Sequence, residues 1–351
     1  MNTFPTYARQ FSYRDAVLHG KNNNSANTFD MAFSKAIQDH PEEATFITYA
    51  QKWAKPILKI LDPNSNWKCI SSNSCHPAIQ YRMTDQLETL IPLRPIGEGG
   101  FKKVKLKLWL RSDGKNELLA RYRVVKTLPY MLEKNELFLQ KLYPNNSLHF
   151  KLISYYSKGT QKERLLGTFF PLTLEQLLEK RSLSNKEVVD LSRSLAHLLN
   201  TLHGNGWCHL DVNPANICLT KNLSPVLIDF DLTAQINTTI LERGTPGYKT
   251  PEISFSPAGY KVESSADMWS FGITLLKMIH PELHKQQETA HNNACIRNDP
   301  DIFTDELVKV HAKLNTSPRP FDKLIVQLIK HTPSQRLTAK ELIDELNRLC
   351  F

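Results

Sequence analysis

The sequence predicts an α+β fold in which strands and helices occupy separate stretches of the chain. Between Leu90 and Phe170, short alternations of apolar and polar residues recur between turn signals, which is typical of antiparallel strands. From Thr173 onward, apolar residues recur at helical spacing. We therefore expect a five-stranded antiparallel sheet followed by a mainly helical region, with a helical extension in front of both.

The composition of the 351 residues is that of an ordinary globular protein, with 41% hydrophobic and 23% charged residues. No apolar run approaches the ~18 residues that indicate a membrane span, and the first ten residues lack the apolar segment of a secretory signal. The six cysteines are scattered, without the paired spacing of a zinc site. These features predict a cytoplasmic or otherwise intracellular protein with no transmembrane segment.

The net charge of +9 is concentrated in one stretch. Residues 97–164 hold 15 Lys and Arg against 6 Asp and Glu, whereas the charges of the remainder balance. A solvated basic face on a small sheet explains this stretch, and attraction to an anionic partner is the alternative. Nucleic acid is not expected as a partner, because no aromatic and basic recognition motif accompanies the charge.

Residues 1–89 are expected to form a helical extension with no catalytic constellation. Residues 30–40 and 41–61 carry helical patterns, and Pro41 sits at an allowed first-turn position of the second. A cap packed on the following domain is one interpretation, and a segment for partner binding or targeting is the other.

A glycine-rich turn follows at the start of the sheet. Gly97, Gly99 and Gly100 lie between two strands, and Val104 begins the alternation of the second strand. Glycines let backbone amides approach phosphate oxygens that a side chain would block, although a merely flexible turn explains the pattern equally well.

The next strand, residues 119–128, places Val124 and Lys126 on one face. An apolar residue two before a lysine fits a roof over adenine and an anchor for phosphate, and a lysine on an edge strand is the simpler alternative. Residues 131–143 are expected to be helical, and Glu136 is the chosen partner for the lysine, with Glu133 as the alternative. Residues 152–156 and 164–170 complete the sheet. Helices are expected over residues 173–180 and 184–203, and Ser184 with Glu187 three residues later is a capping box for the second helix.

The segment His209-Leu-Asp-Val-Asn-Pro-Ala-Asn216 carries the chemistry, together with Asp229-Phe-Asp231. It supplies a carboxylate in a loop (Asp211), an amide five residues on (Asn216), and a second carboxylate (Asp229) after a short apolar strand. Phosphoryl transfer from a nucleotide needs such groups: one carboxylate positions the attacking hydroxyl, while an amide and another carboxylate hold magnesium.

These residues resemble the catalytic and magnesium loops of the eukaryotic-type protein kinase family. The resemblance implies a two-lobed kinase domain over residues 90–351, with an N-lobe at 90–170 and a C-lobe at 171–351. It implies ATP and Mg²⁺ as cofactors, Asp211 as the catalytic carboxylate, Asn216 and Asp229 as metal ligands, and Lys126 with Glu136 on the phosphates. It also places the glycines, Val104, Val124 and Cys218 around the nucleotide.

Three positions depart from the family pattern. Lys102 replaces the third glycine of the nucleotide loop, and Leu210 replaces the arginine that pairs with a phosphorylated activation segment. Activity is therefore expected not to require that phosphorylation. Asn213 replaces a lysine, which removes a cation from the transferring phosphoryl group.

Later motifs separate the hypotheses. The stretch 244–252 resembles the segment that holds a protein substrate, with Thr245 as a serine/threonine kinase feature and Arg336 as the expected partner of Glu252. Small-molecule kinases of the aminoglycoside and choline type lack it. The sequence predicts a serine/threonine protein kinase acting on a protein substrate, with a pseudokinase or scaffold and a small-molecule kinase as alternatives. The combination of a compact kinase region, an unassigned helical extension and several altered motif residues also resembles kinases that intracellular bacteria deliver into host cells.

Overall fold

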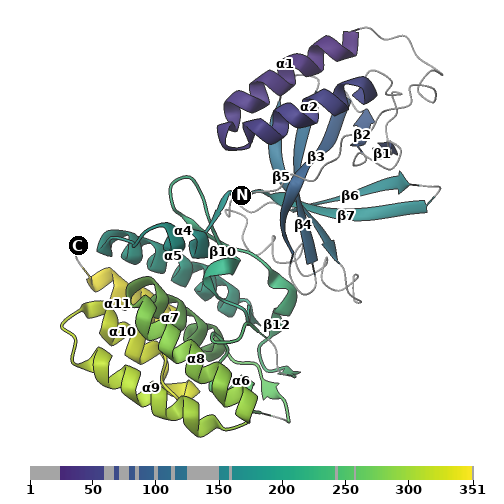
Figure 1. Cartoon of the computed structure of the whole chain (residues 1–351). Coiled ribbons are helices and arrows are strands. Elements are labelled where there is room, and N and C mark those ends of the chain that lie inside the picture. Colours follow the sequence, from purple (N-terminus) through teal and green to yellow (C-terminus); the bar gives the residue numbers. More distant parts are fainter. Residues whose placement is uncertain are drawn as a thin grey trace. The chain divides into compact units, whose positions relative to one another are not determined.

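The computed structural model describes residues 24–58, 67–70, 79–83, 87–98, 102–111, 115–124, 150–157, 160–241, 244–256 and 258–349. The chain divides into two compact units (Figure 1). The first comprises Met1–Pro129 and Leu148–Phe169, and the second comprises Tyr130–Ser147 and Phe170–Phe351.

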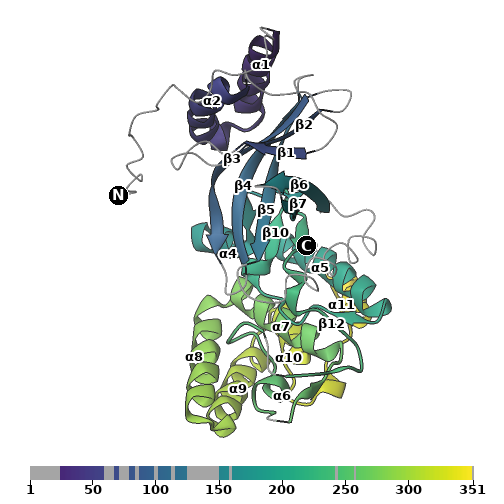
Figure 2. The ribbon, with the colours of Figure 1, turned by 90° about the vertical axis from the view of Figure 1, so that its right-hand side faces the viewer.

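The first unit is built on a closed barrel of seven strands in the order β1-β2-β3-β4-β5-β7-β6 (Figure 2). Neighbouring strands are antiparallel, except that β1 and β6 are parallel. The strands are β1 Trp67–Ile70, β2 Ile79–Met83, β3 Leu87–Glu98, β4 Lys102–Arg111, β5 Asn116–Val124, β6 Phe150–Ser157 and β7 Thr160–Thr168.

The expectation of a five-stranded sheet was wrong. The five expected strands are β3 to β7, and two more, β1 and β2, come from the stretch assigned to the helical extension. These two strands span only four and five residues, too few for alternation to stand out from a loop. The β1–β6 pairing joins Trp67 to Tyr155, a contact too distant in the chain for a local pattern to reveal.

Two helices of the extension pack on this barrel. Helix α1 (Asn24–Asp39) and helix α2 (Ala44–Leu58) are joined by a short 3-10 turn that begins at Pro41. Both lie against the barrel strands in Figures 1 and 2, α1 on β4 and β5 and α2 on β3. Their buried faces share one apolar cluster with the strands: Ala32, Phe33, Ala36, Ile47, Ala50, Ala54, Ile91, Leu106, Leu108, Leu110 and Leu118.

The second unit is mainly helical, as expected. Its described helices of seven or more residues are α4 Leu174–Lys180, α5 Asn185–Gly204, α7 Ser265–Ile279, α8 Pro281–Arg297, α9 Pro300–Asn315, α10 Pro320–Leu328 and α11 Ala339–Arg348. Ser184 and Glu187 form the expected capping box at the start of α5. Almost every residue of α7 is buried on all sides, from Ala266 to Leu276, which makes it the central helix of the unit.

Candidate active site

A small hairpin in the second unit delivers the two expected metal ligands to adjacent positions. Strand β10 (Ile217–Leu219) pairs antiparallel with β11 (Pro225–Leu227), and the Ile228 N–H donates to the Asn216 carbonyl oxygen at 3.0 Å. Asn216 therefore enters the hairpin beside the point where Asp229 leaves it. Asp229 adopts a left-handed backbone conformation with φ 64°, a strained geometry that is concentrated at functional sites.

The Asp211 carboxylate is held by donors from three side chains and one backbone amide. Asn216 Nδ2 donates to Oδ2 at 2.7 Å, and Asn213 Nδ2 donates to Oδ1 at 3.2 Å. Thr245 donates to Oδ1 from both its backbone N–H, at 2.8 Å, and its hydroxyl, at 2.6 Å. The structure thus brings together Asp211, Asn216 and Thr245, which are separated by up to 34 residues in the chain.

Asn213, which stands where the family has a lysine, makes structural hydrogen bonds of its own. Its Oδ1 accepts from the backbone N–H groups of Ala215 and Asn216, at 3.0 and 3.2 Å, and caps the 3-10 turn Pro214–Asn216. Its Nδ2 also donates to the Thr245 hydroxyl at 3.1 Å. Asn213 is buried, so it ties the loop, the carboxylate and the Thr245 segment together, a role that the sequence analysis missed.

The backbone before Asp211 is held by hydrogen bonds to Asp267 of α7. The Asp267 carboxylate accepts the N–H groups of His209 and Leu210 at 2.8 and 2.7 Å, and it contacts His203 Nε2 at 2.8 Å. Burial alone would raise the pKa of this fully buried Asp267, but the hydrogen bond and charge of His203 lower it. No local sequence pattern predicts these contacts, because their partners lie 57 to 64 residues apart in the chain.

His209 is fully buried and packs inside the fold. Its Nδ1 accepts the Asp211 N–H at 3.2 Å, which leaves Nε2 to donate to the Ile228 carbonyl oxygen at 3.0 Å. Its ring meets the buried Phe230 ring edge-on at 5.0 Å. His209 therefore links the loop that carries Asp211 to the strand that leads to Asp229.

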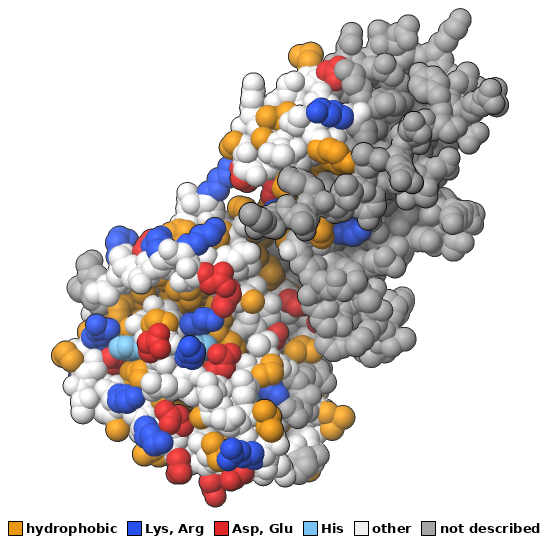
Figure 3. All heavy atoms as spheres, in the orientation of Figure 1, with side chains coloured by type: hydrophobic (Ala, Val, Ile, Leu, Met, Phe, Trp, Pro, Cys, Tyr) orange, Lys and Arg blue, Asp and Glu red, His pale blue; other side chains and the backbone are white. Residues whose placement is uncertain are grey.

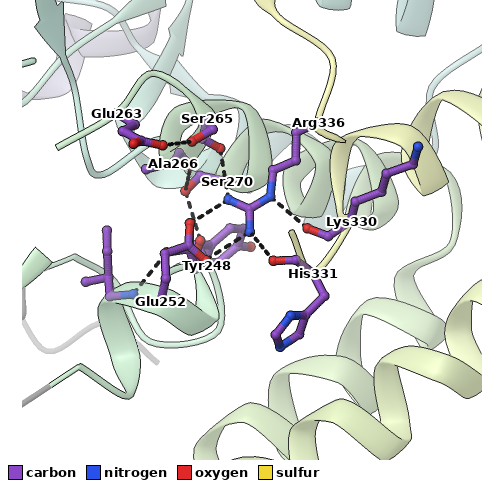
Figure 4. Close-up of polar contacts among 11 residues, drawn as sticks. Tyr248, Glu252, Glu263, Ser265, Ala266, Ser270, Lys330, His331 and Arg336 are labelled. Atoms are coloured by element: carbon purple, nitrogen blue, oxygen red, sulfur yellow. Dashed lines mark hydrogen bonds and ion pairs between the residues drawn. The ribbon is translucent and has the colours of Figure 1, made fainter. Parts of the chain in front are cut away.

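The segment that follows Gly244 is locked by Arg336, as the sequence predicted. The guanidinium forms a two-pronged ion pair with Glu252, at 2.6 and 2.9 Å, and donates to the carbonyl oxygens of Ser265, Lys330 and His331 (Figure 4). All five N–H donors of arginine are thereby used. Because the Arg336 side chain is fully buried, this contact fixes the segment with little freedom.

Several expected nucleotide contacts belong to the first unit. Gly97 pairs with Val104 across β3 and β4, and Val124 ends β5 opposite Lys102. Gly99, Gly100, Lys126, Glu136 and the alternative Glu133 lie outside the described residues. In the second unit Cys218 is buried, and burial raises the pKa of its thiol to about 12, so this side chain is an uncharged apolar surface.

The donor set at Asn216 and Asp229 suits a hard divalent cation. Asn216 directs its Nδ2 to Asp211, with a second bond to the Asp211 carbonyl at 3.0 Å. The side-chain oxygen of Asn216 makes no hydrogen bond among the described residues, and the same side chain contacts the Asp211 carboxylate. Amide and carboxylate oxygens are the ligands that Mg²⁺ prefers, so the residues present fit this ion.

Comparison with known proteins agrees with this geometry. Residues 92–346 match the family model of the protein kinase domain. The chain belongs to the protein kinase family. The residues of the candidate site all lie within the matched stretch. No described helix of this kinase is long and apolar enough to cross a membrane.

The curated relatives of this kinase include kinases of animals and bacteria. It is 26% identical to mitogen-activated protein kinase kinase kinase kinase 3 of Rattus norvegicus, over 65% of this chain and 29% of the relative. It is 31% identical to the phosphorylase b kinase gamma catalytic chain, liver/testis isoform, of the same organism, over 48% of this chain and 42% of the relative. A probable serine/threonine-protein kinase of Clostridium acetobutylicum is 26% identical, over 66% and 36%. The kinase thus matches less than half the length of each of these relatives.

Proposed function

We propose that this kinase transfers the γ-phosphate of ATP to serine or threonine hydroxyls of a protein substrate. The observation that carries the proposal is the constellation around Asp211, in which Asn216 and Thr245 donate to its carboxylate at 2.7 and 2.6 Å. A carboxylate fixed in this way can orient a hydroxyl for in-line attack and accept its proton.

In this mechanism the protein mainly positions the reacting groups. Asp211 receives the substrate hydroxyl, while Asn213 and Thr245 prevent its carboxylate from rotating. Such positioning can supply a large share of the rate enhancement in phosphoryl transfer. The Thr245 segment also offers backbone beside Asp211, where an extended substrate would lie.

Asn216 and Asp229 would hold Mg²⁺, which when bound neutralises the phosphate oxygens and the charge that develops on them. Lys126, oriented by Glu136, would anchor the phosphates, and Gly97, Gly99 and Gly100 would admit them close to the backbone. Val104, Val124 and Cys218 would provide apolar surface for the adenine.

The deciding experiment is transfer of labelled phosphate from ATP to generic acceptor proteins in the presence of Mg²⁺. We expect labelled phosphoserine or phosphothreonine with the wild-type protein and a loss of about 10³-fold or more in Asp211→Asn, because asparagine cannot accept the proton. Lys126→Met should behave in the same way. Full activity in either folded variant would overturn the assignment of the site.

A binding role without turnover is the second candidate, and Asn213 is the observation that favours it. Asparagine carries no charge, and its side-chain amide is hydrogen-bonded to the loop and to Thr245, so it cannot supply the cation that a lysine would bring to a phosphoryl group. A rise in melting temperature with ATP and Mg²⁺, but no labelled product, would support this candidate. The Arg336–Glu252 anchor of the substrate segment weighs against a small-molecule kinase.

The proposal also covers the basic stretch at residues 97–164 and the place where the kinase acts. The described face of the second unit mixes Lys and Arg with Asp and Glu (Figure 3). In the first unit Lys105 is exposed but Lys107 is buried, so the stretch is not simply a solvated face. We therefore propose that the basic stretch at residues 97–164 attracts an anionic partner. We also propose that the kinase acts inside cells, and that it is delivered into a host cell. Binding to anionic vesicles that weakens with salt would test the first.

A further inference from the structure

Helix α8 supports the backbone that continues from Thr245. Gln287 Nε2 donates to the Gly247 carbonyl oxygen at 3.1 Å, and the Gly247 N–H donates to His291 Nδ1 at 3.2 Å. His284, one turn earlier, packs its ring 5.3 Å from that of Tyr248. His284, Gln287 and His291 are all buried, so one face of α8 fixes this segment with polar contacts.

Glu288 is the charged residue that α8 places on the same segment. Gly247 has φ +83°, and a Cβ built there would lie 2.9 Å from Glu288 Cγ. Glycine is therefore required both by the backbone and by the Glu288 side chain that lies over it. Burial raises the pKa of the neighbouring Tyr248 hydroxyl, and the negative charges of Glu175 and Glu288 raise it further.

The Glu288 carboxylate is half-exposed and has no ion-pair partner within the described part of the chain. Two other carboxylates of this region are paired, since Glu175 pairs with Lys277 and Glu252 pairs with Arg336. The aliphatic part of Lys249, which belongs to the same segment, packs beside Gly244. Glu288 thus adds a negative charge to this part of the surface.

This charge lies close to the proposed reaction. Thr245 donates to Asp211 twice, and Gly247 follows two residues later, which is at most about 7 Å along an extended chain. A substrate hydroxyl that reaches Asp211 would therefore bring its neighbouring residues over Gly247. The long side chain of an arginine or lysine in that stretch would meet the Glu288 carboxylate.

We propose that Glu288 makes this kinase select substrates with an arginine or lysine within three residues of the accepting serine or threonine. The inference rests on the proposed kinase function and names its substrate class. A cation there gains a charge-assisted hydrogen bond, and an acidic side chain there meets a like charge.

The test uses the full chain with ATP, Mg²⁺ and a set of alanine-rich peptides that contain one serine. Arginine, alanine or glutamate is placed in turn at each position from three before to three after the serine, and kcat/KM is measured. At one position or more, we expect arginine to exceed glutamate by about five- to tenfold. This preference should shrink in 0.5 M salt, because ions screen a half-exposed pair.

Two variants and a matched control assign the preference to Glu288. Glu288→Gln should abolish the difference between peptides while leaving the rate on the alanine peptide unchanged, and Glu288→Arg should favour glutamate at the same position. Glu282→Lys changes charge on an exposed turn of α8 and should leave the preference intact. An unchanged preference in Glu288→Gln would overturn the inference.

The proposed function can fail independently. If labelled phosphate reaches generic proteins but peptides show no positional preference, the function stands and the inference is wrong. If no phosphate is transferred at all, the function fails, and fluorescence anisotropy then tests the inference with labelled arginine and glutamate peptides. Tighter binding of the arginine peptide that is lost in Glu288→Gln would support it, and equal binding of the two peptides would overturn it.

Discussion

Asn213 shows how one residue can serve a loop and a reacting group together. Its oxygen caps the turn Pro214–Asn216, and its nitrogen holds Asp211 and Thr245. From the sequence, only the absence of a lysine was visible there. The contacts depend on where Thr245 returns in space, 32 residues later, which no local pattern specifies.

Replacing Asn213 with aspartate separates these two roles. Asn213→Asp keeps the oxygen that accepts from Ala215 and Asn216, so the protein should fold normally. It also places a second carboxylate 3.2 Å from the Asp211 oxygen, and repulsion between the two should lower kcat by about 100-fold. Steady-state kinetics and thermal unfolding check both expectations. Asn213→Ala, which loses both roles, should in addition cost about 1 kcal/mol of stability. Wild-type kinetics in Asn213→Asp would show that Asp211 does not need this support.

Leu210 occupies the place of a phosphate-binding arginine, and the structure buries it. It lies in an apolar cluster with Cys208, Ile253 and Val262, with φ 64°. An apolar side chain in these surroundings cannot respond to a phosphate.

We therefore expect phosphatase treatment to leave the initial rate of transfer unchanged. The measurement compares the treated and untreated protein, with mass spectrometry to confirm removal of phosphate, and a kinase of known phosphorylation dependence as the control. A large loss of rate, restored by rephosphorylation, would refute independence from activation-segment phosphorylation.

At the scale of elements, the sequence predicted best where local chemistry decides. The start of α5 was expected from Ser184 and Glu187, and both capping contacts are present. The expected strands from Leu90 to Phe170 also exist, with ends shifted by a few residues. Strands β1 and β2 were not predicted, because their stability comes from pairing with other strands and not from their own short sequences.

The cap of α5 should show in the pH dependence of stability. The Arg181 hydrogen bond and the Ser184 backbone lower the pKa of Glu187 from 4.5 to about 2. A lowered carboxyl pKa adds stability that is complete above 4.5 and is lost as the pH falls toward 2. The difference in melting temperature between wild type and Glu187→Gln should therefore be largest near pH 6 and shrink by pH 3. Glu341→Gln, at the matching cap of α11, should behave alike, and a pH-independent difference would refute this account.

At the scale of the whole molecule, the first compact unit includes residues that precede the kinase motifs. The family match begins at residue 92, close to the boundary at residue 90 that the sequence pattern predicts. Yet α1 and α2 bury Phe33, Ala36 and Ile47 in the same cluster as Ile91 and Leu108 of the barrel. Sequence patterns predicted that these helices exist, but they could not show which surface receives them, because packing partners far apart in the chain leave no periodic signal.

Truncating the Phe33 side chain tests whether the helices stabilise the barrel. Phe33 is 1% exposed, and Phe33→Ala should cost about 3–5 kcal/mol through lost burial and a residual cavity. Amide hydrogen exchange should accelerate in β3 and β4, whereas the amides of α7 in the second unit should keep their protection. Exposed Met31→Ala on the same helix is the matched control, with an expected change within about 0.5 kcal/mol. If β3 and β4 exchange as slowly in Phe33→Ala as in the wild type, α1 is an appendage that the barrel does not need for its stability.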